Sequence, residues 1–393
     1  MKKSKLNLFL SVLVVLVMLV AAGCGGSSGD DKKPAEKAPE KVLKIGVVGP
    51  ESGGSAQLGQ GQHKAAQLAV DEINSKKLAG DWKLEIFFED DEGNPTKSAN
   101  ATNKLLQQSG AHVIIGAINS SATLADMVIT SRAGVPQITA GSTGSSITEQ
   151  GNKWIFRTAV NDEFQADALI KYAKEVLKIT KVATLTAADD YGQSGAKLLA
   201  TAAQKQGVEL VNAQVYNNGD KDFKPQLLAI KDTGAQGIFL WGLYTEAALI
   251  AKQSRQLGVD VQLFGASGMA AQKLIELSEE AGQGLILTQS FLPVSDNPTV
   301  KTFVASYQEK YKESPIPHGA QAYDSVYILA DAVKRAGKTD PEALRDAISK
   351  TSGLKLVTSE VKFNERGDDI GKYLLITKIS GDKFELVTTV KTN

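Results

Sequence analysis

From residue 42 onward, short apolar runs alternate with longer stretches in which apolar residues recur every three or four positions. Residues 42–48 and 84–88 have the composition of buried strands, and residues 62–74 and 95–108 have that of amphipathic helices. Strands that alternate with helices predict parallel sheets with helices on both faces. The sequence therefore predicts an α/β fold.

A second block with the same alternation begins near Asp162. Its expected strands lie at residues 182–185, 208–215, 237–241 and 261–264, with helices between them. The C-terminal part predicts helices at residues 301–312, 321–335 and 341–349, and strands or a hairpin at residues 354–363 and 373–387. Because two α/β blocks follow each other without a close sequence repeat, we expect two doubly wound, Rossmann-like lobes.

The N-terminus has the order of a secretory signal peptide. A positive start is followed by an almost entirely apolar stretch at residues 6–20, and small residues stand directly before Cys24. This position predicts that residues 1–23 are removed and that Cys24 is lipidated, which anchors the protein to a membrane outside the cytoplasm, in the periplasm or at the cell surface. Residues 24–41 are rich in Gly, Ser, Pro and charge and predict a disordered tether. The alternative is an ordinary cleaved signal with an incidental cysteine.

The composition excludes several kinds of site. Cys24 is the only cysteine of 393 residues, so the mature chain would have no free thiol, no disulfide and no cysteine nucleophile. The 44 basic and 44 acidic residues balance, which argues against nucleic acid as a partner. None of the three histidines has a metal-type neighbour at helical spacing, and the common catalytic and phosphate-binding motifs are missing. We expect no metal, no cofactor and no enzyme activity, although dispersed catalytic residues remain an alternative.

Small polar residues follow two of the predicted strands of the first block. Ser120 and Ser121 come after residues 113–115, and Gly141, Ser142 and Thr143 come after residues 135–138. In open α/β sheets, ligands bind outside the carboxyl ends of the strands. Ser120 or Ser121 also stands at a predicted helix start, where free N–H groups suit a carboxylate. The competing interpretation is that these residues are helix caps and turn formers.

Eight segments, taken in order, carry a resemblance to a known family. They are KIGVVGPESGG near Lys44, QLAVDEIN near Val70, DDEGNP near Asp91, VPQITAGST near Pro136, WIFRTAVNDEFQA near Arg157, DDYGQSGA near Tyr191, GDKDF near Phe223 and HGAQAYDSV near Tyr323. From about Leu43 to its end, the chain resembles the leucine/isoleucine/valine-binding proteins of branched-chain amino-acid ABC transporters, which have the type I periplasmic-binding fold. The resemblance implies a solute-binding protein without catalytic activity, with a permease and an ATPase as partners.

The resemblance also divides the chain. It implies that residues 42–161 and 291–370 form lobe 1, and that residues 162–290 and 371–393 form lobe 2. Crossover strands would join the two lobes and act as the hinge on which they close over a small ligand.

Site residues follow from the same resemblance. The hydroxyls of Ser120 and Thr143 and the backbone N–H groups of Ser121 and Gly141 would bind the α-carboxylate of an amino acid. Leu58, in the loop after the first strand, would line the side-chain pocket. Tyr191 and His318 would line the pocket as well, and Asp162 matches an acid just after the first crossover.

Two positions depart from the family pattern. Ser267 stands where relatives usually carry an acid that neutralises the ligand's ammonium, and Leu243 stands where they tend to have a tyrosine. Among the positions carried over, only Asp162 could then supply the negative charge. We prefer an amino-acid ligand paired with Asp162; the alternatives are an acid or amide without a free ammonium, and a ligand sensor with the same fold. Asp162 could also be only a helix N-cap before Phe164.

Overall fold

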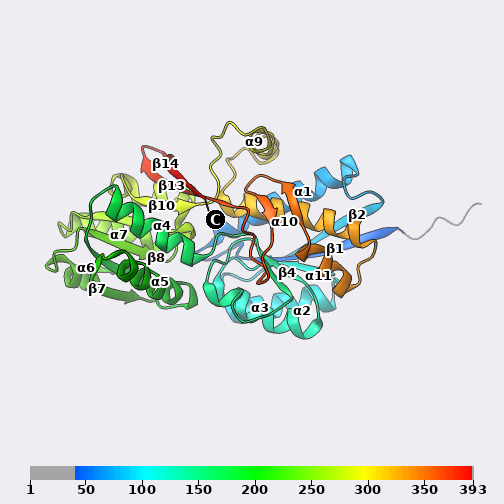
Figure 1. The fold of residues 1–393 in the computed structure, drawn as a ribbon, viewed down its shortest axis with the longest axis horizontal. Helices are drawn as coiled ribbons and strands as arrows, with labels where there is room; N and C mark the ends of the chain where they lie inside the picture. The colour runs from blue at the N-terminus through cyan, green and yellow to red at the C-terminus, as the bar shows by residue number, and fades with distance from the viewer. Residues whose placement is uncertain (1–39, 392–393) are drawn as a thin grey trace, which may run out of the picture. The chain divides into compact units, whose positions relative to one another are not determined.

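The first sheet has five strands in the order β2-β1-β3-β4-β5, and all its neighbouring pairs are parallel (Figure 1). The computed structural model describes residues 40–391. The strands of the first sheet are β1 (Lys41–Gly49), β2 (Trp82–Asp90), β3 (Val113–Ile115), β4 (Gln137–Thr139) and β5 (Ile155–Arg157). Because all five strands run the same way, their carboxyl ends lie along one edge of the sheet, where ligands bind in folds of this class.

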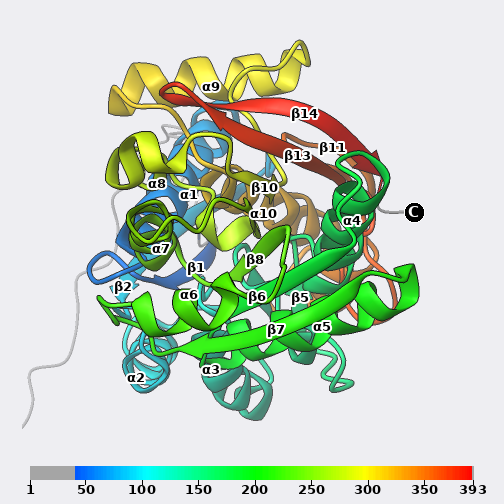
Figure 2. The ribbon, with the colours of Figure 1, turned by 90° about the vertical axis from the view of Figure 1, so that its left-hand side faces the viewer.

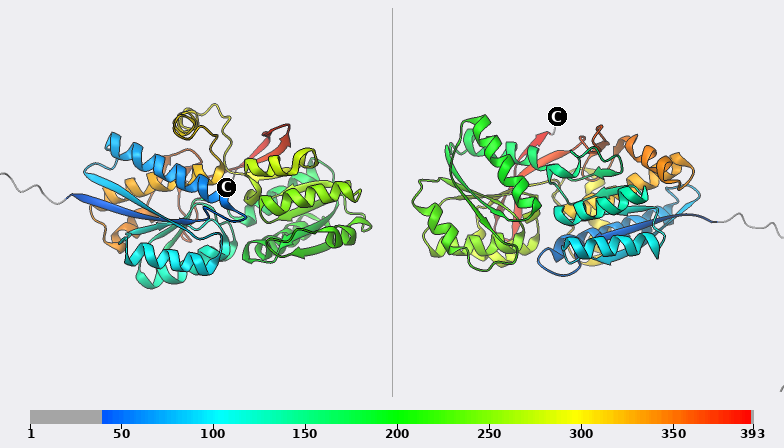
Figure 3. Two further views of the ribbon diagram at one scale, coloured as in Figure 1. Left: turned by 180° about the vertical axis from the view of Figure 1, so that it is seen from behind. Right: turned by 90° about the horizontal axis from the view of Figure 1, so that it is seen from below.

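Helices cover both faces of the first sheet, because successive side chains of a strand point to opposite faces. Leu43, Ile45 and Val47 pack against one helical layer, and Val48 and Ile114 pack against the other. The first layer contains α1 (Ala56–Lys76), α9 (Pro298–Tyr311), α10 (Pro317–Ala336) and α11 (Pro341–Ser349), and the second contains α2 (Pro95–Gln107) and α3 (Ser120–Ala133). Figure 3 shows α1 (blue) and the α2–α3 pair (cyan) on opposite sides of the strands. We call this sheet with its helices lobe 1.

The second sheet has seven strands in the order β14-β13-β10-β9-β8-β6-β7. Its parallel part contains β6 (Lys181–Ala187), β7 (Glu209–Tyr216), β8 (Gly237–Trp241), β9 (Gln262–Gly265) and β10 (Ile286–Gln289). The hairpin of β13 (Tyr373–Ser380) and β14 (Lys383–Lys391) is antiparallel to β10 and forms one edge (Figure 2). A separate small hairpin consists of β11 (Ser352–Lys355) and β12 (Glu360–Lys362).

Helices also cover both faces of the second sheet, and together they form lobe 2. One layer contains α4 (Asp162–Glu175) and α5 (Asp190–Gln206), and the other contains α6 (Lys224–Lys231), α7 (Tyr244–Gln256) and α8 (Gln272–Ser278). Three 3₁₀ turns complete the fold: η1 (Ser145–Ile147), η2 (Ser267–Met269) and η3 (Glu279–Gly282). Gly195 lets α5 approach β8, because a Cβ there would lie 2.1 Å from the Trp241 ring.

The chain passes between the two sheets three times. It leaves the first sheet after β5, returns to lobe 1 after β10, and enters the second sheet again at β13. The lobe limits expected from the resemblance, at residues 161/162, 290/291 and 370/371, fall in these connections. The exact limits of each lobe stay a prediction.

The expected α/β class with parallel sheets is confirmed. The alternation did not reveal β5, β10 or α8, and α1 begins several residues before the expected helix. α3 begins at Ser120, where a helix start was expected. Cys24, the signal peptide and nearly all of the tether lie outside the described residues; β1 begins at Lys41, one residue before the expected start of the fold. Among the helices of residues 40–391, none is both long and apolar enough to cross a membrane.

Candidate functional site

A narrow cavity of about 20 Å³ lies between the lobes and is lined from both. Seven of the predicted ligand-binding residues line it: Leu58, Ser120, Gly141, Thr143, Tyr191, Leu243 and His318. Ile118, Asn119 and Gly268 complete the lining. Four predicted residues are not part of the lining: Ser121, Ser142, Asp162 and Ser267. The cavity is far smaller than the 300–1,000 Å³ of common ligand pockets, so a ligand does not fit into it in this arrangement of the lobes.

The start of α3 forms the polar wall of the cavity on lobe 1. Ser120 is the first residue of the helix and is almost fully buried, and its hydroxyl accepts a hydrogen bond from the Gly144 N–H at 3.4 Å. The N-cap residue Asn119 makes no side-chain capping bond within the described residues. The first N–H groups of a helix have no partner inside the helix, and the helix dipole makes this end positive. The wall therefore suits an anionic group.

The loop after β4 brings Thr143 to the same wall, and buried Arg157 holds the loop in place. The guanidinium donates through Nη1 to the carbonyl oxygens of Thr143 and Gly144, at 2.9 and 2.8 Å. Its Nε donates to Asp368 at 2.8 Å, and its Nη2 donates to the Thr148 hydroxyl at 2.8 Å. Arg157 is only 1% exposed, so these bonds are not shared with solvent. This network holds the backbone of Thr143 in place.

The sequence did not predict that Arg157, Thr148 and Asp368 would hold the Thr143 loop in place. Arg157 stands inside one of the segments that carry the family resemblance, and an arginine that follows two apolar residues of a buried strand could have been a signal. Asp368 could not be paired with it from the sequence, because 211 positions separate the two residues.

Ser142 and Ser121 bond elsewhere. The Ser142 hydroxyl lies 2.6 Å from the Thr123 hydroxyl and donates to the Ile118 carbonyl at 3.0 Å, so it ties together the loops that follow β3 and β4. The Ser121 hydroxyl accepts from the Asp190 N–H at 3.4 Å, and Asp190 belongs to α5 of lobe 2. The Gly141 N–H is directed at the Thr139 hydroxyl at 3.4 Å.

Lobe 2 contributes Tyr191, Leu243 and Gly268 to the cavity. The Tyr191 hydroxyl accepts from the Gly268 N–H at 3.2 Å, and burial raises the pKa of Tyr191 well above its usual value. A Cβ at position 268 would lie 2.8 Å from the Gly242 carbonyl oxygen and 2.9 Å from the Tyr191 hydroxyl, so only glycine fits there. Ser267, where the resemblance led us to expect an acid, donates its backbone N–H to Gln165 at 3.1 Å.

Leu58 and His318 line the cavity from lobe 1. Leu58 lies in the first turn of α1 and not in a loop as expected, because the turn after β1 ends at Ser55 and the helix begins at Ala56. Its side chain packs into the hydrophobic cluster of lobe 2. His318 lies at the start of α10, and burial lowers its pKa to about 4, so the ring is neutral at physiological pH.

Asp162 is fully buried and does not line the cavity, although Thr143 and Tyr191, which do, are close enough to interact with it electrostatically. The Thr143 and Ser194 hydroxyls and the Trp241 indole lie near its carboxylate and lower its pKa, yet neither oxygen has a full hydrogen bond among residues 40–391. Burial is the largest effect and raises the pKa of Asp162 to about 7. The interpretation of Asp162 as an N-cap is wrong. Asn161 is the N-cap and accepts from the Phe164 N–H at 2.9 Å, so Asp162 is the first residue inside α4.

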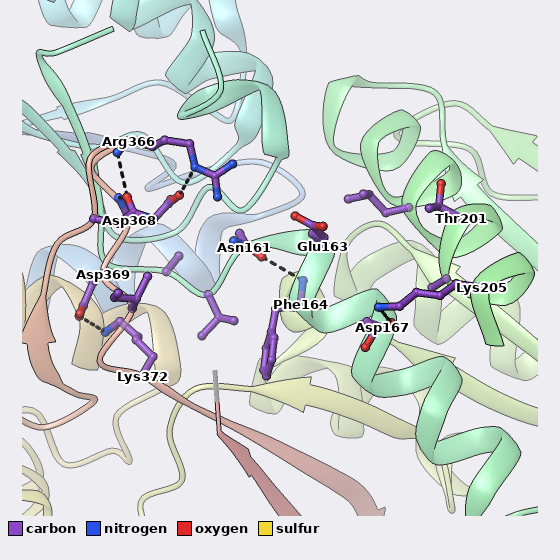
Figure 4. Close-up of a pocket in the computed structure, with 16 residues that line it drawn as sticks. Asn161, Glu163, Phe164, Asp167, Thr201, Lys205, Arg366, Asp368, Asp369 and Lys372 are labelled. Carbon is purple, nitrogen blue, oxygen red and sulfur yellow. Dashed lines mark hydrogen bonds and ion pairs between the residues drawn. The ribbon is translucent and has the colours of Figure 1, made fainter. Parts of the chain in front are cut away.

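A larger cavity of about 350 Å³ lies beside the connections between the lobes (Figure 4). Its charged side chains are largely paired with each other: Lys205 with Asp167 at 3.1 Å, Lys372 with Asp369 at 3.4 Å and Arg366 with Asp368 at 3.7 Å. None of the predicted site residues lines this cavity. The charged groups of this cavity already form ion pairs with one another, so its larger volume does not by itself identify it as the ligand site.

The chain is similar in sequence and in fold to known binding proteins. The family model described as "Periplasmic binding protein" matches residues 42–383. The "Leucine-, isoleucine-, valine-, threonine-, and alanine-binding protein" of Pseudomonas aeruginosa is 28% identical over 329 residues, which cover 83% of this chain and 87% of that protein.

Two solved structures have the same fold. The leucine-binding protein LivK of Thermotoga maritima is 30% identical, with a TM-score of 0.84, and the match covers 89% of this chain and 99% of that one. LivJ of Streptococcus pneumoniae, a substrate-binding protein of a branched-chain amino-acid transporter solved with isoleucine, is 29% identical with a TM-score of 0.83; that match covers 89% and 100% of the two chains. The chain therefore belongs to the periplasmic binding protein family, as a solute-binding protein of the type I fold and not an enzyme.

Proposed function

We propose that this protein is the lipid-anchored, extracytoplasmic binding component of an ABC transporter, and that it binds a small hydrophobic amino acid of the branched-chain type between its lobes. The proposal rests on one observation above all. One wall of the cavity between the lobes is polar and suits a carboxylate group; it consists of the start of α3 and the Thr143 loop. Another wall is apolar. The three relatives named above, two of them described as leucine-binding and one solved with isoleucine, support the same ligand class.

The α-carboxylate of the ligand binds at the start of α3. The hydroxyls of Ser120 and Thr143 donate to it, and the positive end of the helix adds a favourable field. Hydrogen bonds to a charged group contribute about 1.5–3 kcal/mol each. Since Arg157 already holds the Thr143 backbone, little ordering is needed when the ligand arrives.

The ligand's side chain packs against Leu58, Ile118 and Leu243, which give the cavity its apolar wall. Each buried methylene contributes about 0.8 kcal/mol. An aliphatic side chain of three or four carbons suits such a wall, and a charged side chain would find no partner on it.

The ammonium group pairs with Asp162. A buried ammonium without an anion is costly, and the lining of the cavity contains no carboxylate. Asp162 lies directly behind the lining, and its two oxygens make no full hydrogen bond within residues 40–391. A small movement of Thr143 or Tyr191 on ligand entry would bring the carboxylate into contact.

A second candidate ligand is a carboxylate or amide without an ammonium group. It is favoured by Ser267 at the position of the usual acid, and by the layer of Thr143 and Tyr191 between Asp162 and the cavity. Calorimetric titration with L-leucine and with 4-methylpentanoate, its des-amino analogue, separates the two candidates. An amino-acid site binds leucine more tightly by about ten- to a hundredfold, in line with a charged hydrogen bond. Equal affinities support the second candidate.

A thermal-shift screen over amino acids and small carboxylates tests the ligand class as a whole, because binding raises the melting temperature by mass action. We expect the largest shifts from leucine, isoleucine and valine. Turnover of amides, esters or peptides would contradict the binding role. A permease gene and an ATPase gene beside this one would favour transport over a ligand sensor of the same fold.

The anchor is a separate part of the proposal. We propose that residues 1–23 are cleaved, that Cys24 carries the lipid and that the following residues are the tether. Intact mass spectrometry of protein extracted from membranes checks this directly. An acylated Cys24 at the mature N-terminus is the expected result, and a free N-terminus at another residue contradicts it.

A further inference from the structure

The starts of α1 and α8 are capped by side chains of the opposite lobe. In lobe 1, the backbone N–H of Gln57, in the first turn of α1, donates to the phenolic oxygen of Tyr244 at 3.2 Å. In lobe 2, the backbone N–H of Lys273, in the first turn of α8, donates to Oε1 of Gln57 at 2.8 Å. Tyr244 is the first residue of α7 in lobe 2. Gln57 therefore takes part in both bonds. Its backbone N–H is capped by Tyr244 of lobe 2, and its side chain caps the start of α8 in lobe 2.

Neither helix has a side-chain cap of its own within the described residues. Ser55 flanks α1, but its hydroxyl bonds to the Asn119 side chain at 3.1 Å and not to the helix. Ala271 flanks α8 and has no polar group. The first N–H groups of a helix need an outside partner, so both helices depend on the other lobe for one.

The two capping residues stand next to the apolar wall of the cavity. Gln57 precedes Leu58, and Tyr244 follows Leu243, whereas neither Gln57 nor Tyr244 lines the cavity itself. Each of the two bonds joins lobe 1 to lobe 2, so neither can form when the lobes are apart. Their position next to Leu58 and Leu243 would couple closure to assembly of the apolar wall.

We infer that Gln57 and Tyr244 set the affinity for the ligand without touching it, by capping the helices of the closed state across the cleft. This inference rests on the proposed binding of a ligand between closing lobes. A ligand that binds the closed state must also supply the free energy of closure, so a closed state stabilised by the caps binds more tightly. Each cap should shift the equilibrium between separated and closed lobes about fivefold toward the closed state, which is the equivalent of about 1 kcal/mol.

The variants Gln57→Ala and Tyr244→Phe each remove one cap and leave the partner bond in place. Titration of the full chain with L-leucine should show about fivefold weaker binding for each variant and about twenty-five-fold weaker binding for the double variant. Gln60→Ala is the matched control. Gln60 lies on the same helix, and its amide donates to the Glu51 carbonyl at 2.9 Å inside lobe 1, so its removal should leave the affinity unchanged.

Hydrogen exchange of single backbone amides tests the coupling without any ligand. In Gln57→Ala the amide at position 57 keeps its bond to Tyr244, and in Tyr244→Phe the amide of Lys273 keeps its bond to Gln57. Because opening of the lobes exposes both amides, loss of one cap should speed exchange at the other amide severalfold, and Gln60→Ala should not.

The outcomes separate this inference from the proposed ligand. If L-leucine does not bind to the wild type, the proposed ligand is wrong, and exchange alone decides on the caps. Unchanged exchange at the remaining amide in both variants contradicts the inference. Unchanged leucine binding in both variants contradicts it as well, because the caps would then have no effect on affinity. Tighter binding also contradicts it, because the caps would then stabilise the closed state only without the ligand.

Discussion

Thr143 is the side chain on which the proposed binding of the ligand's carboxylate depends most. Its backbone is fixed by Arg157 and its side chain lines the cavity. Thr143→Ala should weaken leucine binding at least about tenfold, since it removes a hydrogen bond to a charged group. Ser120→Ala should act in the same direction, and calorimetric titration measures both.

Ser146→Ala is the control, because Ser146 is an exposed residue of the neighbouring 3₁₀ turn. It should bind leucine as the wild type does. If Thr143→Ala and Ser120→Ala also keep the wild-type affinity, the carboxylate does not bind at the start of α3.

The raised pKa of Asp162 predicts that the stability of the protein and its affinity for leucine change in opposite directions with pH. Its pKa is raised from 3.8 to about 7 by burial, so in this window the folded chain holds a proton that the unfolded chain has lost. The contribution of Asp162 to stability therefore falls as the pH rises from about 4 to about 7. An ammonium ligand needs the ionised carboxylate, so leucine affinity should rise as the pH passes through about 7, by up to about tenfold per unit below it.

Asp162→Asn should remove both trends for this position. The melting temperatures of the variant and the wild type must be compared at each pH. Burial also raises the pKa of Asp126 to about 8, so this second group lowers the stability of both proteins as the pH rises. His318 stays neutral through the window, since its pKa is about 4. Melting curves and titrations between about pH 5 and pH 8 measure the two trends. Leucine affinity that is flat with pH in the wild type would argue against an ion pair with Asp162.

Sequence reasoning located the polar residues of the site better than their partners. Ser120 and Thr143 could be found because small polar residues after buried strands collect at one edge of a parallel sheet. The position of Asp162 behind the lining, and not in it, could not be found, because it depends on how α4 packs against Tyr191 and Trp241. The same holds for Arg157, whose counter-ion Asp368 is distant in sequence and which also bonds to backbone carbonyls.

At the scale of elements, β5 is tied to the last connection between the lobes. The Arg157 N–H donates to the Gly367 carbonyl at 2.8 Å, and the Asp369 N–H donates to the Arg157 carbonyl at 2.9 Å. The buried pair of Arg157 and Asp368 adds side-chain bonds to the same junction. Asp368→Asn leaves the arginine without its counter-ion and should lower the free energy of unfolding by about 3 kcal/mol.

Urea unfolding measures this change, and Asp296→Asn is its control. Asp296 pairs with Lys301 at 3.0 Å on the surface, where ion pairs contribute about 0–1 kcal/mol. Equal effects of the two substitutions would show that the buried pair does not hold the junction together.

The elements that the sequence did not reveal are the short ones. β5 has three residues, β10 has four and α8 has seven. A run of three or four apolar residues has no measurable period, and its strand character comes from the neighbours with which it pairs. The longer elements, such as α2 and α11, match the expected ranges closely, because their periods and end signals agree.

At the scale of the molecule, the site exists only where the two lobes meet. Leu58 and His318 approach from lobe 1 and Tyr191, Leu243 and Gly268 from lobe 2, and these residues come from widely separated parts of the chain. Periodicity predicts each sheet, but it does not place one sheet against the other. The family resemblance supplied that placement as an expectation. The candidate site could therefore be outlined from the sequence, whereas the cross-lobe caps could not.

A crystal structure of the protein with L-leucine tests the proposed binding mode. We expect one leucine between closed lobes, with its carboxylate at the start of α3 within hydrogen-bond distance of the Ser120 and Thr143 hydroxyls, and its side chain against Leu58 and Leu243. Its ammonium should lie next to Asp162. Leucine in the cavity beside the lobe connections, leucine turned with its carboxylate away from α3, or no leucine at saturating concentration would contradict the account.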